Sequence, residues 1–290
     1  MTPASPTDGP ARRPAGALPA LSCILALLTT GCPLFRPRPA PPPLPPGEVV
    51  RAVRALSEGF HTVTDGDISL SIRTVDEAGR ARRLPTLGGA LAFDARLPAL
   101  WLLTEKLTRT VFLLKAAGPR FWLVCYSTNE LVTGTEIAYR KLPQLLRPDE
   151  VRSYFAGPEQ LGISWPTAEM VLEPADYRFD VRVLGVLRRQ VFVDRRRLVL
   201  SGIRRYDALG RVETDLRMDR YRPAGDGLFP RRLWLDRPLN GVTIELHLGD
   251  PKPNKPLPEA TFAPPPLLPG WRLIDLDVED PSAIEFFRAD

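Results

Sequence analysis

The spacing of hydrophobic residues changes along the chain from a helical period to a period of two. Between residues 49 and 56, valine and leucine recur at helical intervals, which predicts an amphipathic helix over 48–60. From about residue 62 the pattern alternates, because Ile68, Leu70 and Ile72 are separated by polar residues. Such alternation is typical of strands in a sheet with one buried face.

The alternating pattern recurs on both sides of a second predicted helix at 148–155. The predicted strands are 62–73, 88–94, 100–107, 110–116, 120–126, 131–139, 177–183, 188–194, 198–206, 212–221, 229–236 and 242–249. An antiparallel sheet of about eleven strands usually curls. The sequence therefore predicts an α+β fold: a curved antiparallel sheet forming an incomplete β-barrel, with helices covering its concave face.

The N-terminus has the pattern of a secretory signal. Arg12 and Arg13 precede an apolar run over 17–28, which is too short to span a bilayer. The Leu-Thr-Thr-Gly-Cys sequence that ends at Cys32 resembles the lipobox of bacterial lipoproteins, although Thr29 stands where that motif has leucine. The resemblance implies cleavage after residue 31 and lipidation of Cys32, and the alternative is an ordinary secretory signal.

Proline content then divides the rest of the chain. Residues 33–46 read PLFRPRPAPPPLPP, which favours a semi-rigid polyproline II stalk. We predict a signal peptide over 1–31, a lipidated cysteine and linker over 32–46, a folded domain over 47–263 and an irregular tail over 264–290. A disordered proline-rich segment is the alternative interpretation of the stalk.

Composition narrows the class of protein. Hydrophobic residues make up 44% and charged residues 25%, which is ordinary for a globular domain. Both signs of charge are interleaved, so the net charge of +5 forms no basic stripe and we expect no nucleic-acid partner. Cys23 lies in the signal and Cys32 is the lipidation site. Only Cys125 is left in the domain, so the mature chain has no intramolecular disulfide.

Catalytic patterns are absent from the sequence. His61 and His247 are far apart, and no HExxH, CxxC, P-loop or GxSxG motif occurs. The carboxylates of Asp65 and Asp67 could pair in a catalytic site, but we interpret them as solvated groups at a turn or strand end. We therefore expect no enzyme activity, no metal and no cofactor.

The order of these elements resembles the LolA/LolB superfamily of periplasmic lipoprotein carriers and receptors, with its mycobacterial lipid-binding relatives. The residues that carry the resemblance are the first strand 67–72, Val111–Leu114 leading through Gly118 to Arg120–Leu123, Val191–Asp194, Tyr206–Gly210, Gly227–Arg231 and Asn254–Phe262. The resemblance extends over about residues 47–263. The loop Ala95–Pro98 stands where the receptors have a protruding leucine.

The resemblance implies a hydrophobic cavity that accepts acyl chains of lipoproteins or lipids, with a periplasmic carrier protein as a candidate partner. LolB-type receptors are lipid-anchored in the outer membrane. Pro33 follows Cys32 here, and the sorting rule reserves inner-membrane retention for aspartate at that place, so we expect an outer-membrane anchor facing the periplasm. The alternative is a non-catalytic envelope scaffold or interaction lipoprotein with the same fold and a closed cavity.

An acyl-chain cavity needs large apolar side chains, because most of the ligand surface becomes buried. The candidate ligand-binding residues are Ile68, Leu70, Ile72, Leu91, Trp101, Leu103, Phe112, Leu114, Trp122 and Trp234. The alternative for each is ordinary packed core, since both have the same sequence pattern.

Overall fold

The computed structural model describes residues 41–287 except 77, 154–160, 164–168 and 226. The predicted signal peptide, Cys32 and most of the proline-rich linker lie outside these residues. The chain divides into two compact units, and the second, Pro41–Asp290, contains every described residue.

The first described element of this second unit is helix α2 (Pro46–Gly59), which confirms the helix predicted over 48–60. Pro46 suits the first helical turn because its missing N–H would have no partner there. Glu48 places a negative charge at the positive end of the helix dipole. Val49, Val50 and Val53 form its buried face.

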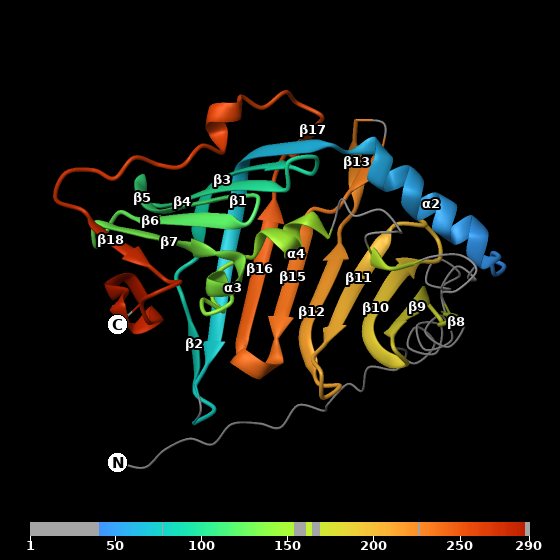
Figure 1. Ribbon diagram of the computed structural model, residues 1–290. Coiled ribbons are helices and arrows are strands. Elements are labelled where there is room, and N and C mark those ends of the chain that lie inside the picture. Colours follow the sequence, from blue (N-terminus) through green and yellow to red (C-terminus); the bar gives the residue numbers. More distant parts are fainter. Residues whose placement is uncertain (1–40, 77, 154–160, 164–168, 226, 288–290) are drawn as a thin grey trace, which may run out of the picture. The chain divides into compact units, whose positions relative to one another are not determined.

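Strands are the main secondary structure of the unit (Figure 1). They are β1 (Thr62–Val75), β2 (Ala81–Arg83), β3 (Leu87–Asp94), β4 (Ala99–Lys106), β5 (Arg109–Ala117), β6 (Arg120–Cys125), β7 (Glu130–Thr135), β8 (Glu169–Leu172), β9 (Asp176–Val183), β10 (Val186–Asp194), β11 (Leu200–Tyr206), β12 (Val212–Asp219), β13 (Arg222–Ala224), β14 (Gly227–Phe229), β15 (Arg232–Arg237), β16 (Val242–Leu248), β17 (Lys252–Pro253) and β18 (Arg272–Asp275).

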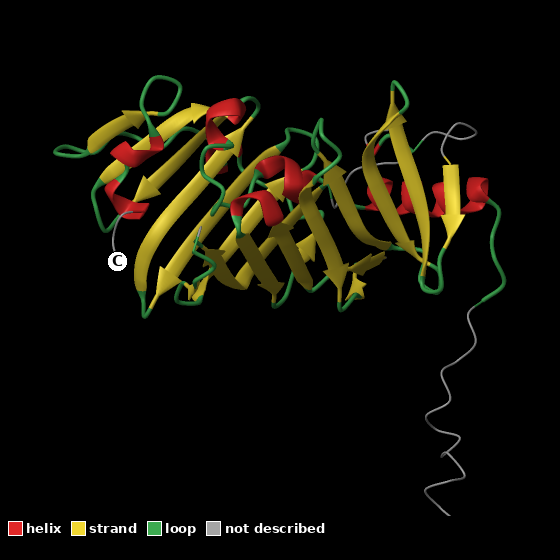
Figure 2. Ribbon diagram, turned by 90° about the horizontal axis from the view of Figure 1, so that it is seen from below, coloured by secondary structure: helices red, strands yellow, loops and turns green. Residues whose placement is uncertain are grey.

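One large sheet follows the order β18-β7-β6-β5-β4-β3-β1-β16-β15-β12-β11-β10-β9-β8, and β2 and β17 also pair with β1. In the described residues its edges, β18 and β8, do not pair, so the curved sheet is not closed into a barrel (Figure 2). Strands β13 and β14 form a separate hairpin.

Two features of the predicted sheet need correction. The large sheet has 16 strands rather than about eleven. It is also mixed rather than wholly antiparallel, because β18 runs parallel to β7. The strands missing from the prediction, such as β2, β17 and β18, have only two to four residues. A period of two has no room to show in so short a segment.

The predicted irregular tail over 264–290 also differs from the structure. Its strand β18 adds to the edge of the sheet, and Ile274, Leu276 and Ile284 are buried. Just before this strand, the ring of Trp271 packs edge-on against Tyr126, with centroids 5.7 Å apart. The surrounding prolines and short apolar runs concealed this order in the sequence. The tail is part of the folded unit up to its last described residues.

Strand β1 joins the two halves of the sheet, because it pairs with β3 on one side and β16 on the other. Its register with β3 shifts between Asp65 and Ile68, at a β-bulge. The carboxylate of Asp65 accepts the backbone N–H groups of Asp67 at 2.8 Å and Asp250 at 3.1 Å. Burial raises the pKa of Asp65 despite these hydrogen bonds. The Asp65 carboxylate thus shapes a bulge.

Between β7 and β8 the chain leaves the sheet and crosses in front of β1, β16 and β15 (Figure 1). We call residues 136–153 the crossing segment. It contains α3 (Glu136–Tyr139), which Thr135 caps, and α4 (Pro148–Arg152), which begins with a proline. Short 3₁₀ helices occur elsewhere, at Pro238–Asn240, Glu259–Thr261, Pro281–Ala283 and Glu285–Phe287.

The two helices of the crossing segment differ in how well the sequence predicted them. Helix α4 lies within the helix predicted over 148–155, of which residues 154 and 155 lie outside the described ones. Helix α3 was not predicted, because the strand expected over 131–139 ends at Thr135. Thr135 accepts a hydrogen bond from the backbone N–H of Ala138 and so begins the helix at this point.

Candidate functional site

We call the face of the sheet toward the crossing segment the inner face. Its side chains are mostly apolar, with a few buried polar groups such as Thr104 and Arg237 among them. Cross-strand pairing aligns Leu91, Leu102, Leu114, Leu123 and Val132 in one row over β3 to β7. All five side chains are buried. Such a row of large aliphatic side chains lets two layers pack without any polar group to satisfy.

A second row continues this surface across the other half of the sheet. Leu70 pairs with Leu246, which pairs with Leu233, and Leu233 pairs with Met218. Each of these side chains is also buried. The inner face therefore extends over strands far apart in the sequence.

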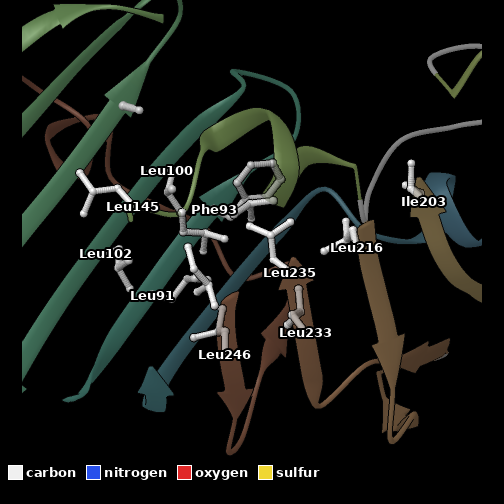
Figure 3. Close-up of a cluster of buried hydrophobic side chains, with 14 of the residues drawn as sticks. Leu91, Phe93, Leu100, Leu102, Leu145, Ile203, Leu216, Leu233, Leu235 and Leu246 are labelled. Atoms are coloured by element: carbon white, nitrogen blue, oxygen red, sulfur yellow. The ribbon is translucent and has the colours of Figure 1, made fainter. Parts of the chain in front are cut away.

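The crossing segment lies on this surface through its own apolar residues. Tyr139 packs edge-on against Phe121, with ring centroids 4.5 Å apart, and its hydroxyl donates to the carbonyl of Leu146 at 2.8 Å. Figure 3 shows Leu145 in one cluster with strand residues such as Leu91 and Leu235. The crossing segment therefore packs against part of the inner face.

A buried ion pair fastens the crossing segment to the sheet. The Nε of Arg237, at the end of β15, donates to Glu150 Oε1 at 3.1 Å, and both side chains are almost fully buried. The guanidinium also donates to the carbonyls of Pro143 and Leu145. Burial raises the pKa of Glu150, against the opposing charge of Arg237. A buried charge must be paired in this way, because desolvation is costly.

A second pair of residues holds α4 to β11. Arg205 contacts the carboxylate of Asp149 and donates to Ser153 Oγ at 2.9 Å. Burial raises the pKa of Asp149, but the charge and hydrogen bond of Arg205 outweigh it and the pKa lies below its usual value. Two arginines from different strands therefore fix the position of one short helix.

Among the described residues, a small apolar cavity lies between the crossing segment and the sheet, and a second small, partly polar cavity lies beside α2. One, of about 20 Å³, is lined without polar surface by Val63, Leu91, Val151, Phe229, Pro230, Leu233, Leu246 and Leu248. The other, also of about 20 Å³, is lined by Val53, Leu56, Ser57, Phe60, Leu200, Tyr221, Leu228, Phe229 and Pro230. Phe229 and Pro230 line both cavities and so separate them. The Phe229 ring packs edge-on against Phe60, with centroids 5.5 Å apart.

The structure brings six of the ten candidate residues together. Ile68, Leu70, Ile72, Leu91, Phe112 and Leu114 all belong to the buried cluster of the inner face. Of these, Leu91 lines an apolar cavity. The other five are packed side chains of the same surface.

The remaining four candidates, Trp101, Leu103, Trp122 and Trp234, are half-buried and lie on the outer face. Successive side chains of a strand point to opposite faces. Because Leu102 and Leu123 point inward, the adjacent residues Trp101, Leu103 and Trp122 point outward. Trp101 and Trp122 flank Lys115, whose Nζ donates to the carbonyl of Ala263 at 3.1 Å. Both faces of these strands carry apolar residues, so the sequence alone did not identify the inner one.

The residues that close the interior were not predicted from the sequence. Val151, Phe229 and Pro230 line the cavities, and Arg237 fixes the crossing segment. The sequence did contain a signal for Arg237, because it follows Leu233 and Leu235 at the same alternating positions. A charged side chain on the buried face of a strand requires a buried partner. No sequence signal pointed to the long-range partners.

Among the described residues, no helix is long and apolar enough to cross a bilayer. Within the same part of the chain, no three histidine, cysteine or acidic residues gather where they could hold a metal ion.

The architecture to be compared with known proteins is an open, curved sheet with a crossing segment on one side. No protein-family model and no curated protein sequence matches this chain. A DUF1329 family protein from Desulfovibrio piger is similar in structure, with a TM-score of 0.50 and 11% identity over 76% of this chain and 97% of that one. At this identity the likeness concerns the fold alone.

Two further solved structures are similar at lower TM-scores. A LolA superfamily protein from Nitrosomonas europaea has a TM-score of 0.46 at 12% identity, over 77% of this chain and 99% of that one. A domain named as an outer membrane lipoprotein-sorting protein, from Vibrio parahaemolyticus, has a TM-score of 0.48 at 14% identity, over 74% of this chain and 94% of that one.

Proposed function

We propose that this chain is a cell-envelope lipoprotein that binds acyl chains of lipoproteins or lipids on its inner face. The observation that carries the proposal is an extensive apolar cluster, with an apolar-lined cavity, between a curved sheet and a separate crossing segment. Each methylene group removed from water contributes about 0.8 kcal/mol, so an acyl chain needs no special motif to bind there.

The proposed complex requires the interior to open. A cavity of about 20 Å³ holds roughly one water molecule, whereas ligand pockets have volumes of about 300–1,000 Å³. In our proposal an acyl chain displaces side chains of the crossing segment and of Phe229–Pro230. The ion pairs of Arg237 and Arg205 then set the free energy that opening costs.

We further propose that Cys32 carries the anchoring lipid and that the domain faces the periplasm from the outer membrane. The support is the lipobox-like sequence before Cys32 and the proline-rich stalk after it. Expression of the full chain with radiolabelled palmitate tests the anchor. We expect label in the wild type and none in Cys32→Ser; equal labelling of both would contradict it.

A second candidate function is a non-catalytic envelope scaffold or interaction lipoprotein. The small volume of the two cavities that described residues line favours it, because neither has room for cargo. Neither function uses catalysis, a metal or a cofactor. A periplasmic carrier protein is a partner only of the lipid-binding function.

Lipid analysis of the purified protein separates the two functions. The full chain with Cys32→Ser, purified from the expressing bacterium, is extracted and examined by mass spectrometry, and then titrated with a fluorescent fatty acid. Lipid binding predicts co-purified acyl lipids and saturable binding of the probe. A lipid-free protein that leaves the probe unbound would favour the scaffold.

A further inference from the structure

A third, larger pocket lies outside the apolar interior, is open to solvent and is lined mainly by polar residues. Its volume is about 300 Å³, and its lining residues are Asp67, Ser69, Arg220, Arg222, Arg231, His247, Leu248 and Gly249. The ends of β12 and β16, the start of β15 and the hairpin of β13 lie at the same end of the sheet (Figure 1). This volume is within the range of small-molecule sites.

The charge of this cavity is one-sided. Three arginines line it, against the single carboxylate of Asp67. Among the described residues, no carboxylate lies within ion-pair distance of Arg220 or Arg222. The positive charge of these two arginines is therefore not neutralised by the residues that the structure describes.

The guanidinium of Arg231 has unused hydrogen-bonding capacity. The nearby carboxylates of Asp65 and Asp250 attract its charge, and its Nη1 donates to the carbonyl of Gly249. Its buried Nε has no partner among the described atoms. Arginine presents several N–H donors in a rigid fork that matches the oxygen atoms of a phosphate. The hydroxyl of Ser69 adds a further donor to the same cavity.

We propose that this cavity binds a phosphate group, carried either by a soluble phosphate ester or by a lipid headgroup. Two or three guanidinium groups around one small volume suit a tetrahedral anion with several acceptor oxygens. A single planar carboxylate would engage only one such fork.

The position of the cavity favours the lipid headgroup, and this source rests on the proposed function. Leu248 lines both the polar cavity and the apolar cavity of the inner face. Pro230 lines the apolar cavity, and the next residue, Arg231, lines the polar one. A phosphate held by the arginines would therefore place attached acyl chains near Leu248, one of the residues that line the apolar cavity.

The test compares three soluble probes with the full chain carrying Cys32→Ser, by calorimetric titration at physiological salt. The probes are dioctanoyl phosphatidic acid, dioctanoylglycerol and inorganic phosphate. The variant is R220Q/R222Q, and the control is R83Q/R109Q, which removes the same charge from exposed strand positions. We expect R220Q/R222Q to lose affinity for the phosphate-bearing probe by about tenfold or more, and the control to keep it within about twofold.

The three probes separate the possible results. Binding of phosphatidic acid but not of inorganic phosphate would identify a lipid headgroup. Equal affinity for these two probes would identify a soluble phosphate ester, because the acyl chains would then add nothing to binding. The proposal is overturned if neither phosphate-bearing probe binds, or if R220Q/R222Q binds them as the wild type does. Equal affinity for dioctanoylglycerol and phosphatidic acid would also overturn it, while leaving the acyl-binding function intact. Phosphate binding without any dioctanoylglycerol binding would support the phosphate site and contradict the acyl-binding function.

Discussion

Arg237 and Glu150 form an ion pair that joins the end of β15 to helix α4 across 87 positions of sequence, with exposed side-chain fractions of 1% and 2%. The same guanidinium donates to two carbonyls of the crossing segment. This one arginine therefore holds both the loop and the helix that cover the inner face.

Removing one partner of this pair should be costly. Arg237→Met leaves the Glu150 carboxylate buried without its cation, so we expect the free energy of unfolding to fall by about 3–5 kcal/mol. The double variant R237M/E150Q should lose less than the sum of its single variants, because neither charge is then left alone. Urea unfolding of all four proteins gives the coupling energy. Additive losses would show that the pair does not act as a unit.

The Asp149–Arg205 pair should make the free energy of unfolding depend on pH in the acidic range. The pKa of Asp149 lies below its usual value, so the native state favours the charged form. Its contribution is present above the unfolded pKa of about 3.9 and is lost as the pH falls through the lower native pKa. We expect Asp149→Asn to cost about 2 kcal/mol at pH 7 and clearly less at pH 3.

Urea unfolding at both pH values checks this dependence. Glu58→Gln, an exposed change in α2, is the matched control, and we expect it to leave the curve unchanged at either pH. A cost for Asp149→Asn that is the same at pH 7 and pH 3 would contradict the assignment.

Phe229 should control the volume of the apolar interior. Its side chain lines both small cavities, so Phe229→Ala joins them and should destabilise the fold by about 3–5 kcal/mol. If the interior accepts acyl chains, the same variant should bind a fluorescent fatty acid more tightly than the wild type. Phe192→Ala removes an equal ring from the outer face and serves as the control. Equal probe binding by the two variants would argue against an interior site.

Two neighbouring glycines of β3 should respond differently to substitution. A methyl group at Gly89 would overlap the carbonyl oxygen of Leu103 and lie 3.0 Å from the Cα of Thr104, whereas one at Gly88 has only an ordinary contact at 3.9 Å. Because backbone atoms cannot move aside cheaply, we expect Gly89→Ala to cost about 3 kcal/mol and Gly88→Ala less than about 1 kcal/mol. Thermal unfolding distinguishes them, and similar losses would contradict the described packing of β3 on β4.

The fold was largely predictable because its signals are local. The alternation of Ile68, Leu70 and Ile72 is a property of adjacent residues, and so is the valine stripe of α2. Strand β18 was not predictable, because its four residues pair with β7 through contacts far along the chain. The order of elements sufficed for a resemblance in fold, but not for the number of strands.

The site was only partly predictable, for a related reason. Leu102 and Trp101 are both apolar, and only the pairing of their strand decides which of them points inward. The closing residues Val151 and Phe229 come from segments that the sheet brings together only in three dimensions. The arginine-lined cavity was missed because its residues belong to separate turns and strand ends.

Photo-crosslinking tests the central claim, that acyl chains bind on the inner face, most directly. The full chain with Cys32→Ser is irradiated with a diazirine fatty acid, and the modified residues are identified by peptide mass spectrometry. We predict adducts concentrated at residues that line the apolar cavity, such as Leu91, Phe229 and Leu246, and we expect unlabelled fatty acid to reduce them. Adducts confined to outer-face residues such as Trp101 and Trp122, or no competable adduct at all, would contradict the claim.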